Sequence, residues 1–353
     1  MSKIRVLVLF GGKSGEHAVS LASARSVMQA LSPEKYDIIP MGISQTGQWI
    51  HTPNVLGQLT EASQNELPLQ KTTDSQISHN TLAQIPDFSS IHGVDVVFPV
   101  LHGPYGEDGR LQWLLDMVWL PYVGSGVGGS AVGMDKIYTK ALFIQAGLKQ
   151  LPYYAFNLHD WKVNPEEVTS SIEALWYPVF VKPANMGSSV GISKVKSRET
   201  LIAAIEEALI YDKRIVVEKG LNRPREIELA VLGNDEPMVS IAGEIMPDIK
   251  HEFYSYESKY TEGGADLTIP AHISADTLHE LQWMAKKAFQ AVGARGLSRV
   301  DFLLDRETGD CYINEINTMP GFTKFSMYPK LWEASWIAYS ELLDRLIILA
   351  QEK

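Results

Sequence analysis

The sequence has only one cysteine, Cys311, among its 353 residues. A lone cysteine excludes an internal disulfide framework and a cysteine-based zinc site. Because Cys311 stands in an apolar run, we expect a small buried side chain there. No stretch approaches the ~18 apolar residues of a membrane span, and the apolar run at 6–10 is too short for a signal-peptide core. We therefore expect a cytoplasmic protein with no membrane partner.

Positively charged residues are also fewer than negatively charged ones. Lys and Arg total 31 against 42 Asp and Glu, so the formal net charge is −11. A net-acidic chain is a poor candidate for a general nucleic-acid binder, and we expect no such partner. Any anionic substrate must then be held by a few placed cations. The composition, 45% hydrophobic and 21% charged, is that of a globular protein and excludes disorder, collagen and coiled coil.

The order of elements predicts an α/β fold of two or three domains. An apolar strand at 4–10 runs into glycines and is followed by a helix at 19–31 and a strand at 38–43. Polar residues at 51–90 interrupt the pattern as a peripheral excursion. Further strands are expected at 94–101, 178–182, 192–195, 214–218, 226–232, 238–244, 299–304 and 311–316. Further helices are expected at 111–119, 136–146, 200–208, 275–292 and 331–351.

Two glycine motifs resemble nucleotide-binding patterns but do not satisfy them. Gly12-Lys13-Ser14 ends like a P-loop, yet Leu7 stands where that motif needs glycine. The run 124–129 has the spacing G-x-G-x-x-G but no acidic residue about 20 positions later. We interpret it as a glycine-rich turn between domains.

A third motif, at 187–191, matches G-x-S-x-G with Ser189 in the position of a hydrolase nucleophile. That nucleophile needs a helix after it, whereas the β-branched residues that follow favour a strand. The run is then a flap between two strands, whose N–H groups and hydroxyls suit phosphate oxygens. A plain flexible turn and a serine hydrolase remain as alternatives.

Two acids are expected to face each other on one hairpin. The runs 299–302 and 314–317 alternate with period two around a turn at 306–310. This register places Asp301 opposite Glu315 and Arg299 opposite Asn317. Oxygen ligands of this kind suit Mg²⁺ shared with substrate phosphates. The alternative is a structural network in which Arg299 pairs with the acids.

Two lysines fit the same interpretation. Lys136 opens a helix after the glycine-rich turn, and Lys182 ends a strand directly before the flap. Both positions suit a phosphate ligand, although either lysine alone is compatible with a surface charge.

Six motifs, taken together and in order, resemble the D-alanine–D-alanine ligases of the ATP-grasp superfamily over nearly the whole chain. They are Phe10-Gly-Gly-Lys-Ser-Gly-Glu-His17 with Val19-Ser20, His102-Gly-Pro-Tyr-Gly-Glu-Asp-Gly109, Gly133-Met-Asp-Lys136, Val181-Lys-Pro-Ala-Asn-Met-Gly-Ser-Ser-Val-Gly191, Tyr256-Glu-Ser-Lys-Tyr260 and Asn314-Glu-Ile-Asn-Thr-Met-Pro-Gly321. The resemblance implies a three-domain ATP-grasp architecture: a Rossmann-like parallel-sheet domain at 1–135, a small domain with the flap at 136–220, and a domain with the metal-binding hairpin at 221–353.

The resemblance also implies the reaction. ATP phosphorylates the carboxylate of one D-alanine, the amine of a second D-alanine attacks the acyl phosphate, and D-alanyl-D-alanine for peptidoglycan synthesis is released with ADP and phosphate. ATP is the co-substrate, two Mg²⁺ ions are the expected metals with Mn²⁺ as a substitute, and a homodimer is implied.

The family's roles carry over to matching positions. Asp301, Glu315 and Asn317 would hold the metals, and Arg299 with the Gly321 N–H would stabilise the oxyanion. Lys136 and Lys182 would bind phosphates, Glu218, Lys219 and Leu221 would flank adenine, and Glu226 would bind ribose. Glu16, Ser188 and Tyr260 would position the first D-alanine, with His102 beside its carboxylate. Lys259 would contact the transferred phosphoryl group and Ser326 the second carboxylate.

Tyr260 implies an amine acceptor, because relatives that make D-alanyl-D-lactate carry another residue there. A ligase with another acceptor such as D-lactate, and a non-catalytic nucleotide-binding protein, remain as alternatives. The excursion at 51–90 and Met327, where the family commonly has Leu, are departures from the family pattern.

Overall fold

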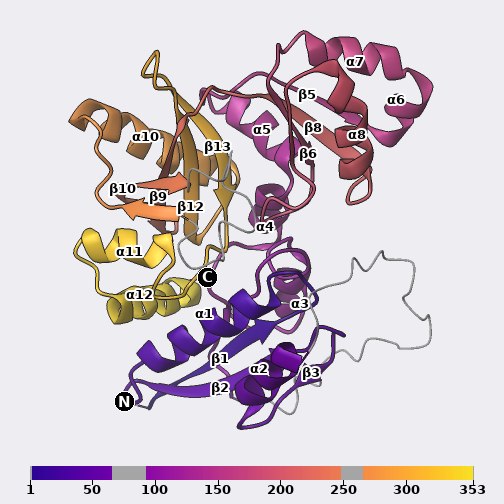
Figure 1. Ribbon diagram of the computed structural model, residues 1–353. Coiled ribbons are helices and arrows are strands. Elements are labelled where there is room, and N and C mark those ends of the chain that lie inside the picture. The colour runs from indigo at the N-terminus through magenta and orange to yellow at the C-terminus, as the bar shows by residue number, and fades with distance from the viewer. Residues whose placement is uncertain (1, 66–92, 248–264, 353) are drawn as a thin grey trace.

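The computed structural model describes residues 2–65, 93–247 and 265–352, and it consists of three lobes, each built on its own sheet (Figure 1). The architecture is mixed α/β, as expected from the sequence. Among the described residues, no helix is long and apolar enough to span a bilayer.

The N-terminal lobe has a four-stranded sheet in the order β3-β2-β1-β4. Strands β1 (Ile4–Gly11), β2 (Tyr36–Ile43) and β4 (Val96–Pro99) are parallel, and the short β3 (Trp49–Ile50) is antiparallel to β2. Helices α1 (His17–Ala30), α2 (Val55–Asn65) and α3 (Arg110–Met117) belong to this lobe. Residues 6–10 of β1 are buried on both faces, which explains their continuous apolar run.

The second lobe has a smaller antiparallel sheet in the order β5-β8-β6-β7. Its strands are β5 (Tyr153–Asn157), β6 (Val179–Pro183), β7 (Ser193–Val195) and β8 (Arg214–Lys219). Helices α6 (Leu158–Val163), α7 (Pro165–Glu173) and α8 (Arg198–Leu209) lie on it, and α5 (Lys136–Gln145) leads into it. The sequence analysis did not anticipate β5, α6 or α7.

The C-terminal lobe has five antiparallel strands in the order β11-β10-β9-β12-β13. They are β9 (Arg225–Gly233), β10 (Met238–Pro247), β11 (Ala265–Thr268), β12 (Gly296–Leu304) and β13 (Cys311–Asn317). Helix α10 (Ala275–Ala291) packs on this sheet with buried Leu281, Met284 and Phe289. Cys311 is buried there as a free thiol, as expected.

The glycine-rich run 124–129 is only partly a turn. Helix α4 (Val127–Met134) begins inside it, so the expected turn is limited to residues 124–126. The glycines allow close packing, because a Cβ built on Gly129 would lie 2.6 Å from the Gly293 carbonyl oxygen. This run packs against the turn before β12, where Ser125 Oγ accepts a hydrogen bond from the Arg295 N–H at 3.2 Å.

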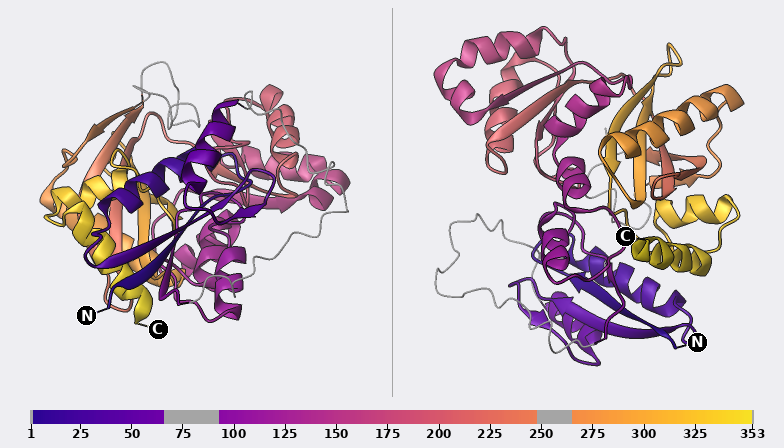
Figure 2. Two further views of the ribbon diagram at one scale, coloured as in Figure 1. Left: turned by 90° about the horizontal axis from the view of Figure 1, so that it is seen from below. Right: turned by 180° about the vertical axis from the view of Figure 1, so that it is seen from behind.

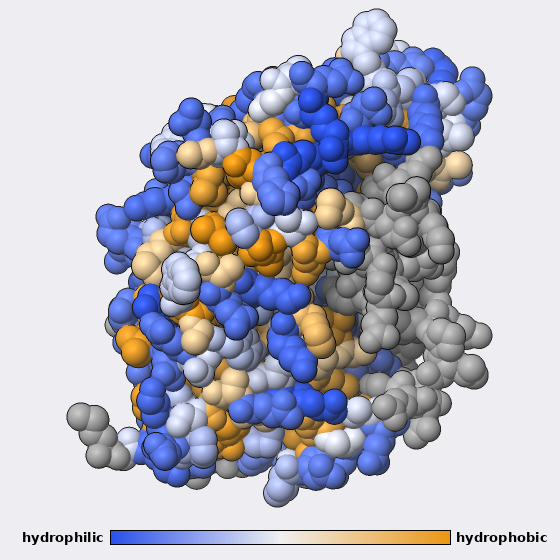
Figure 3. All heavy atoms as spheres, turned by 60° about the vertical axis from the view of Figure 1, so that its left-hand side comes forward, coloured by the Kyte–Doolittle hydropathy of each residue, from blue (hydrophilic) through white to orange (hydrophobic). Residues whose placement is uncertain are grey.

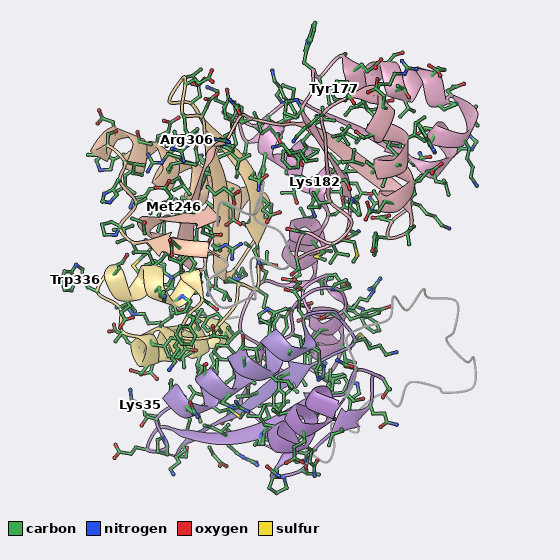
Figure 4. All side chains as sticks on the ribbon, viewed as in Figure 1. Lys35, Tyr177, Lys182, Met246, Arg306 and Trp336 are labelled. Atoms are coloured by element: carbon green, nitrogen blue, oxygen red, sulfur yellow. The ribbon has the colours of Figure 1, made fainter. Side chains whose placement is uncertain are left out.

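The single helix expected at 331–351 is two helices, α11 (Met327–Ala334) and α12 (Tyr339–Gln351). The chain turns between them, where Trp336 has a φ of 69° and its side chain points into solvent (Figure 4). The apolar spacing continues across this turn, which is why periodicity alone did not reveal the break.

Helix α12 lies between the N-terminal and C-terminal lobes (Figure 2). Its buried side chains, Leu342, Leu343, Leu346 and Ile347, share one hydrophobic core with β1 and β4 of the N-terminal sheet. On the outer face shown in Figure 3, apolar residues are interspersed with charged ones.

Candidate active site

A cavity of about 500 Å³ lies where the three lobes meet. Residues from α1, the 102–107 loop, α5, the flap, β9, β12, β13 and the loop after β13 line it. Nine of the expected site residues are among them: Glu16, His102, Lys136, Ser188, Arg299, Glu315, Asn317, Gly321 and Ser326. The cavity therefore brings together residues as far apart in the chain as Glu16 and Ser326.

The hairpin of β12 and β13 has the expected register at its functional end. Asp301 pairs with Glu315, and Arg299 pairs with Asn317. The register then shifts by one residue, so that Phe302 faces Ile313. The shift leaves Asn314 as the extra residue of a β-bulge, and Asn314 also lines the cavity.

A third carboxylate extends this row. On the other side of β12, Asp301 pairs with Glu228 of β9, so three adjacent strands each place one acid at the same level. Arg299 contacts both neighbours: its Nε and Nη2 each donate to an oxygen of Asp301 at 2.7 Å, and its Nε lies 3.1 Å from Glu228 Oε2, an ion pair without a hydrogen bond. The structure thus contains the Arg299 network. Three carboxylates against one guanidinium leave two negative charges in this row.

The donor set at this hairpin fits a hard divalent cation. It consists only of carboxylate and amide oxygens, which are ligands for Mg²⁺. Over the residues described here, no three carboxylate, imidazole or thiol groups gather into one closed cluster. Asn317 Oδ1 accepts a hydrogen bond from the Met319 N–H at 3.0 Å, which fixes the amide at the edge of the cavity.

The flap is a loop between two antiparallel strands, β6 and β7. Ser188 and Ser189 both have positive φ, 51° and 58°, so they form a tight turn and not a strand-to-helix elbow. Strand β7 follows Ser189, and this geometry excludes the nucleophile elbow that a Ser189 hydrolase requires.

Lys136 connects the flap to the rest of the site. Its Nζ donates to the Met186 carbonyl oxygen at 2.5 Å, and its N–H donates to the Ala184 carbonyl oxygen. The preceding residue, Asp135, caps α5 by accepting from two backbone N–H groups and pairs with Arg214 of β8. The start of α5 is therefore fixed relative to the beginning of the flap and to β8.

Lys182, Glu218 and Lys140 form a buried ion triad next to the cavity. Glu218 Oε1 lies 3.1 Å from Lys182 Nζ, and Glu218 Oε2 lies 3.1 Å from Lys140 Nζ. Burial alone would raise the pKa of the Glu218 carboxyl, but the attraction of Lys140 and Lys182 lowers it to about 2. Figure 4 shows Lys182 on β6. Of the three, only Lys140 lines the cavity.

Two buried carboxyls and one imidazole form the opposite wall. A Cβ built on Gly187 of the flap would lie 3.8 Å from Glu16 Oε2 and from Glu107 Oε1, so the flap covers both acids. Burial, together with the charge of Glu16, raises the pKa of Glu107 to about 8. Glu107 Oε1 accepts the Gly103 N–H at 2.6 Å.

The His102 ring is held by two hydrogen bonds. Nδ1 lies 3.1 Å from the Met319 carbonyl oxygen, which can only accept, so Nδ1 carries the proton. Nε2 then accepts from the Ser23 hydroxyl at 3.2 Å. Burial lowers the pKa of His102, which agrees with a neutral ring. His102 thereby ties the N-terminal lobe to the loop after β13.

That loop carries Gly321 and Ser326. A Cβ on Gly321 would lie 2.8 Å from Ser326 Oγ, so only glycine fits there without moving Ser326. Ser326 Oγ accepts the Thr323 N–H at 3.1 Å. The loop is fixed further by the Tyr339 hydroxyl, which donates to the Phe322 carbonyl oxygen at 2.6 Å.

The other expected residues that the structure describes do not line the cavity. Lys219 ends β8, Leu221 follows it half-buried, and Glu226 is two residues before Glu228 on β9. Asp301 accepts a hydrogen bond from Arg299, which lines the cavity, whereas Asp301 itself does not. Lys259 and Tyr260 are outside the described residues.

Three residues were missed by the sequence analysis: Lys140, Glu228 and Glu107. Lys140 is one helical turn after Lys136 and so shares its helix face, a spacing that could have indicated it. Glu228 alternates with Glu226 on a strand, and Glu107 stands inside the His102–Gly109 motif.

Comparison with known proteins agrees with this geometry. The family model described as "D-ala D-ala ligase N-terminus" matches residues 5–125, and "D-ala D-ala ligase C-terminus" matches residues 142–348. The curated D-alanine–D-alanine ligases of Geobacillus thermodenitrificans and Geobacillus kaustophilus are each 50% identical over 99% of this chain and 96% and 95% of their own lengths.

Solved structures give the same result for the fold. The VanG D-Ala:D-Ser ligase from Enterococcus faecalis superposes with a TM-score of 0.81 at 36% identity, over 99% of this chain and 100% of that one. The D-alanine–D-alanine ligase from Coxiella burnetii gives a TM-score of 0.81 at 34% identity, over 100% and 95%. With both halves matched and full-length relatives at 50% identity, this chain belongs to the D-alanine–D-alanine ligase family and has its ATP-grasp fold.

Proposed function

We propose that the cavity joins two D-alanines to D-alanyl-D-alanine at the expense of ATP, a step in peptidoglycan precursor synthesis. The observation that carries the proposal is the convergence of flap, lysines, acidic hairpin and buried Glu16 and His102 on one cavity. Full-length relatives at 50% identity support the same activity.

In the first step, a carboxylate oxygen of one D-alanine attacks the γ-phosphorus of ATP, and the bond to ADP breaks. Lys136 and Lys182 are proposed to hold the phosphates under the flap, with Glu218, Lys219 and Leu221 beside adenine and Glu226 at the ribose. Bound Mg²⁺, or Mn²⁺ in its place, would neutralise phosphate charge and polarise the phosphoryl group. We assign Asp301, Glu315 and Asn317 as its ligands.

In the second step, the amine of the other D-alanine attacks the acyl carbon, phosphate leaves, and the amine loses a proton. The Arg299 guanidinium and the Gly321 N–H are proposed to hold the oxyanion that forms. Glu16 and Ser188, with Tyr260, would position the first D-alanine beside His102. Lys259 would contact the transferred phosphoryl group, and Ser326 would bind the second carboxylate. Closure of the flap over the cavity would keep water from the acyl phosphate.

The three sheets fall one in each of the ranges 1–135, 136–220 and 221–353, which supports the domain division we propose. Phe143 and Leu148 belong to the second range but pack into the core of the C-terminal sheet. We also propose a homodimer in the cytoplasm, as the resemblance implies. Light scattering of the purified protein tests the dimer.

The identity of the second substrate, the acceptor, needs its own test, because one structural relative is named a D-Ala:D-Ser ligase. The test incubates the protein with ATP, Mg²⁺ and D-alanine, with parallel reactions containing L-alanine, D-serine or D-lactate. ADP release is followed and the product is identified by mass.

Formation of D-alanyl-D-alanine with one ADP per product, and none from L-alanine, is the expected result. Turnover only with D-serine or D-lactate would retain the mechanism and replace the acceptor. Nucleotide binding with no turnover in any reaction would overturn the ligase assignment in favour of a non-catalytic nucleotide-binding protein.

A further inference from the structure

The ion triad next to the cavity has more positive charge than its own balance requires. Glu218 is 4% exposed and each of its two carboxylate oxygens contacts one lysine, Lys140 on α5 and Lys182 on β6. One lysine would suffice to neutralise one carboxylate. With both lysines protonated the triad has a net charge of +1, a state that the burial of Lys140 opposes by lowering its pKa and that its ion pair with Glu218 favours.

The two lysines differ in their freedom to move. Lys140 borders the cavity, but its side chain is only 3% exposed and its Nζ lies 5.3 Å from the centre of the Tyr153 ring, so it is packed into the cavity wall. The Lys182 side chain is 12% exposed and stands on the strand that leads directly into the flap. Lys182 is therefore the member that can turn toward a bound phosphate.

When one lysine moves away from Glu218, the buried carboxylate still needs a positively charged partner. Removing the last partner of a buried carboxylate is strongly unfavourable, and a phosphate contact would have to offset that loss. With Lys140 in place, Glu218 keeps one ion pair when Lys182 moves. Without Lys140, Lys182 would be the only counter-ion of Glu218 and would be held there.

We propose that Lys140 is a positioning residue for nucleotide binding: by remaining paired with Glu218, it releases Lys182 to the phosphates of ATP. This inference rests on the proposed role of Lys182 as a phosphate ligand. It assigns a function to a buried lysine that acts through Glu218 and not by contact with the nucleotide.

The test measures the dissociation constant of MgADP and MgATP by calorimetry, together with the KM values for ATP and D-alanine. The four proteins are wild type, Lys140→Met, Glu218→Gln and the double variant. We expect Lys140→Met to weaken ATP binding at least about tenfold and to leave the KM for D-alanine within about twofold. In the Glu218→Gln background, the same substitution should change ATP affinity by less than about threefold, because no carboxylate remains to hold Lys182.

An equal loss in both backgrounds would overturn the proposal, since a direct nucleotide contact or a packing role does not depend on the charge of Glu218. Lys286→Met, which removes an exposed lysine paired with Glu236 at 3.0 Å, is the matched control and should leave all constants unchanged. If Lys140→Met does not fold, the ATP affinity of the double variant is compared with that of Glu218→Gln. A loss of ATP affinity above tenfold in that comparison overturns the proposal. Absence of MgATP binding by the wild type would instead contradict the proposed function itself.

Discussion

Arg299 donates two parallel hydrogen bonds to Asp301, from Nε to Oδ1 and from Nη2 to Oδ2, each 2.7 Å long. The residue proposed to hold the oxyanion is thus paired with a residue proposed to hold the metal. Each Asp301 oxygen retains a second lone pair, so the guanidinium and a cation can share this carboxylate. The two functions of the hairpin are thereby coupled through one side chain.

Substitution of Asp301 should lower catalytic activity through the loss of its charge. We expect Asp301→Asn to lower kcat by about 100-fold or more, the size of loss found when a group that stabilises developing charge is removed. Steady-state ADP release at several Mg²⁺ concentrations measures it. Glu307→Gln, in the exposed turn of the same hairpin, is the control. Equal activity of the two variants would rule out a role for Asp301.

Glu228 holds the other side of Arg299 and should affect the metal as well as the oxyanion. In Glu228→Gln the guanidinium loses one charged partner and interacts more strongly with Asp301. We expect kcat to fall about tenfold and Mn²⁺ to bind more weakly in the presence of ADP, measured by the loss of free Mn²⁺ in electron paramagnetic resonance. A change in melting temperature with unchanged kcat and Mn²⁺ affinity would show that Glu228 is only structural.

Glu107 should make stability depend on pH. Its pKa is raised from 4.5 to about 8, so the folded protein keeps a proton that the unfolded chain loses, and the free energy of unfolding falls as pH rises between these values. Glu107→Gln should remove this slope and gain more than about 1 kcal/mol over the wild type between pH 5 and pH 8. Urea unfolding at pH 5, 6.5 and 8 measures it, with exposed Glu333→Gln as the control. Parallel slopes in wild type and Glu107→Gln would contradict the shift.

Gly321 should tolerate no side chain. In Gly321→Ala the new Cβ would lie 2.8 Å from Ser326 Oγ, so Ser326 must move. We expect the KM for the second D-alanine to rise about tenfold while ATP binding is unchanged, because about 1.4 kcal/mol of binding is lost with Ser326 misplaced. Gly128→Ala is the matched control, since nothing lies within 4 Å of a Cβ there. Unchanged kinetics would show that Ser326 does not bind the second D-alanine.

The two flap serines should respond differently. Both serines line the cavity, but only Ser188 is proposed to position the first D-alanine. We therefore expect Ser188→Ala to lower kcat/KM for D-alanine at least tenfold and Ser189→Ala to have the smaller effect. The KM and kcat for ATP and D-alanine measure both. Complete loss of activity in Ser189→Ala alone, without any need for ATP, would restore the hydrolase alternative.

The sequence predicted the hairpin register because period-two alternation and a glycine-containing turn fix which residues of β12 and β13 face each other. The bulge at Asn314 could not be predicted in this way, since one extra residue leaves the local alternation of each strand almost unchanged. Glu228 was missed for a related reason: its partner Asp301 is 73 positions away, and only the sheet order places β9 next to β12.

The helix break at Trp336 and the ion pairs of Lys140 depend on tertiary structure as well. Helical spacing continues across the turn, and Lys140 is an ordinary helix residue until β6 and β8 bring Lys182 and Glu218 to it. In contrast, the α/β class and the strand–flap–strand arrangement follow from short-range patterns, and the structure confirms them.

Helix α12 completes the core of the N-terminal sheet, and its Asp344 accepts hydrogen bonds from Lys35 and Tyr36, each 2.6 Å long. During translation, the first 135 residues leave the ribosome long before this helix exists. At about 5–20 residues per second, the missing layer arrives roughly 10–40 s later. Until then, the apolar side chains of the N-terminal lobe that pack against α12 in the finished protein are without this native partner.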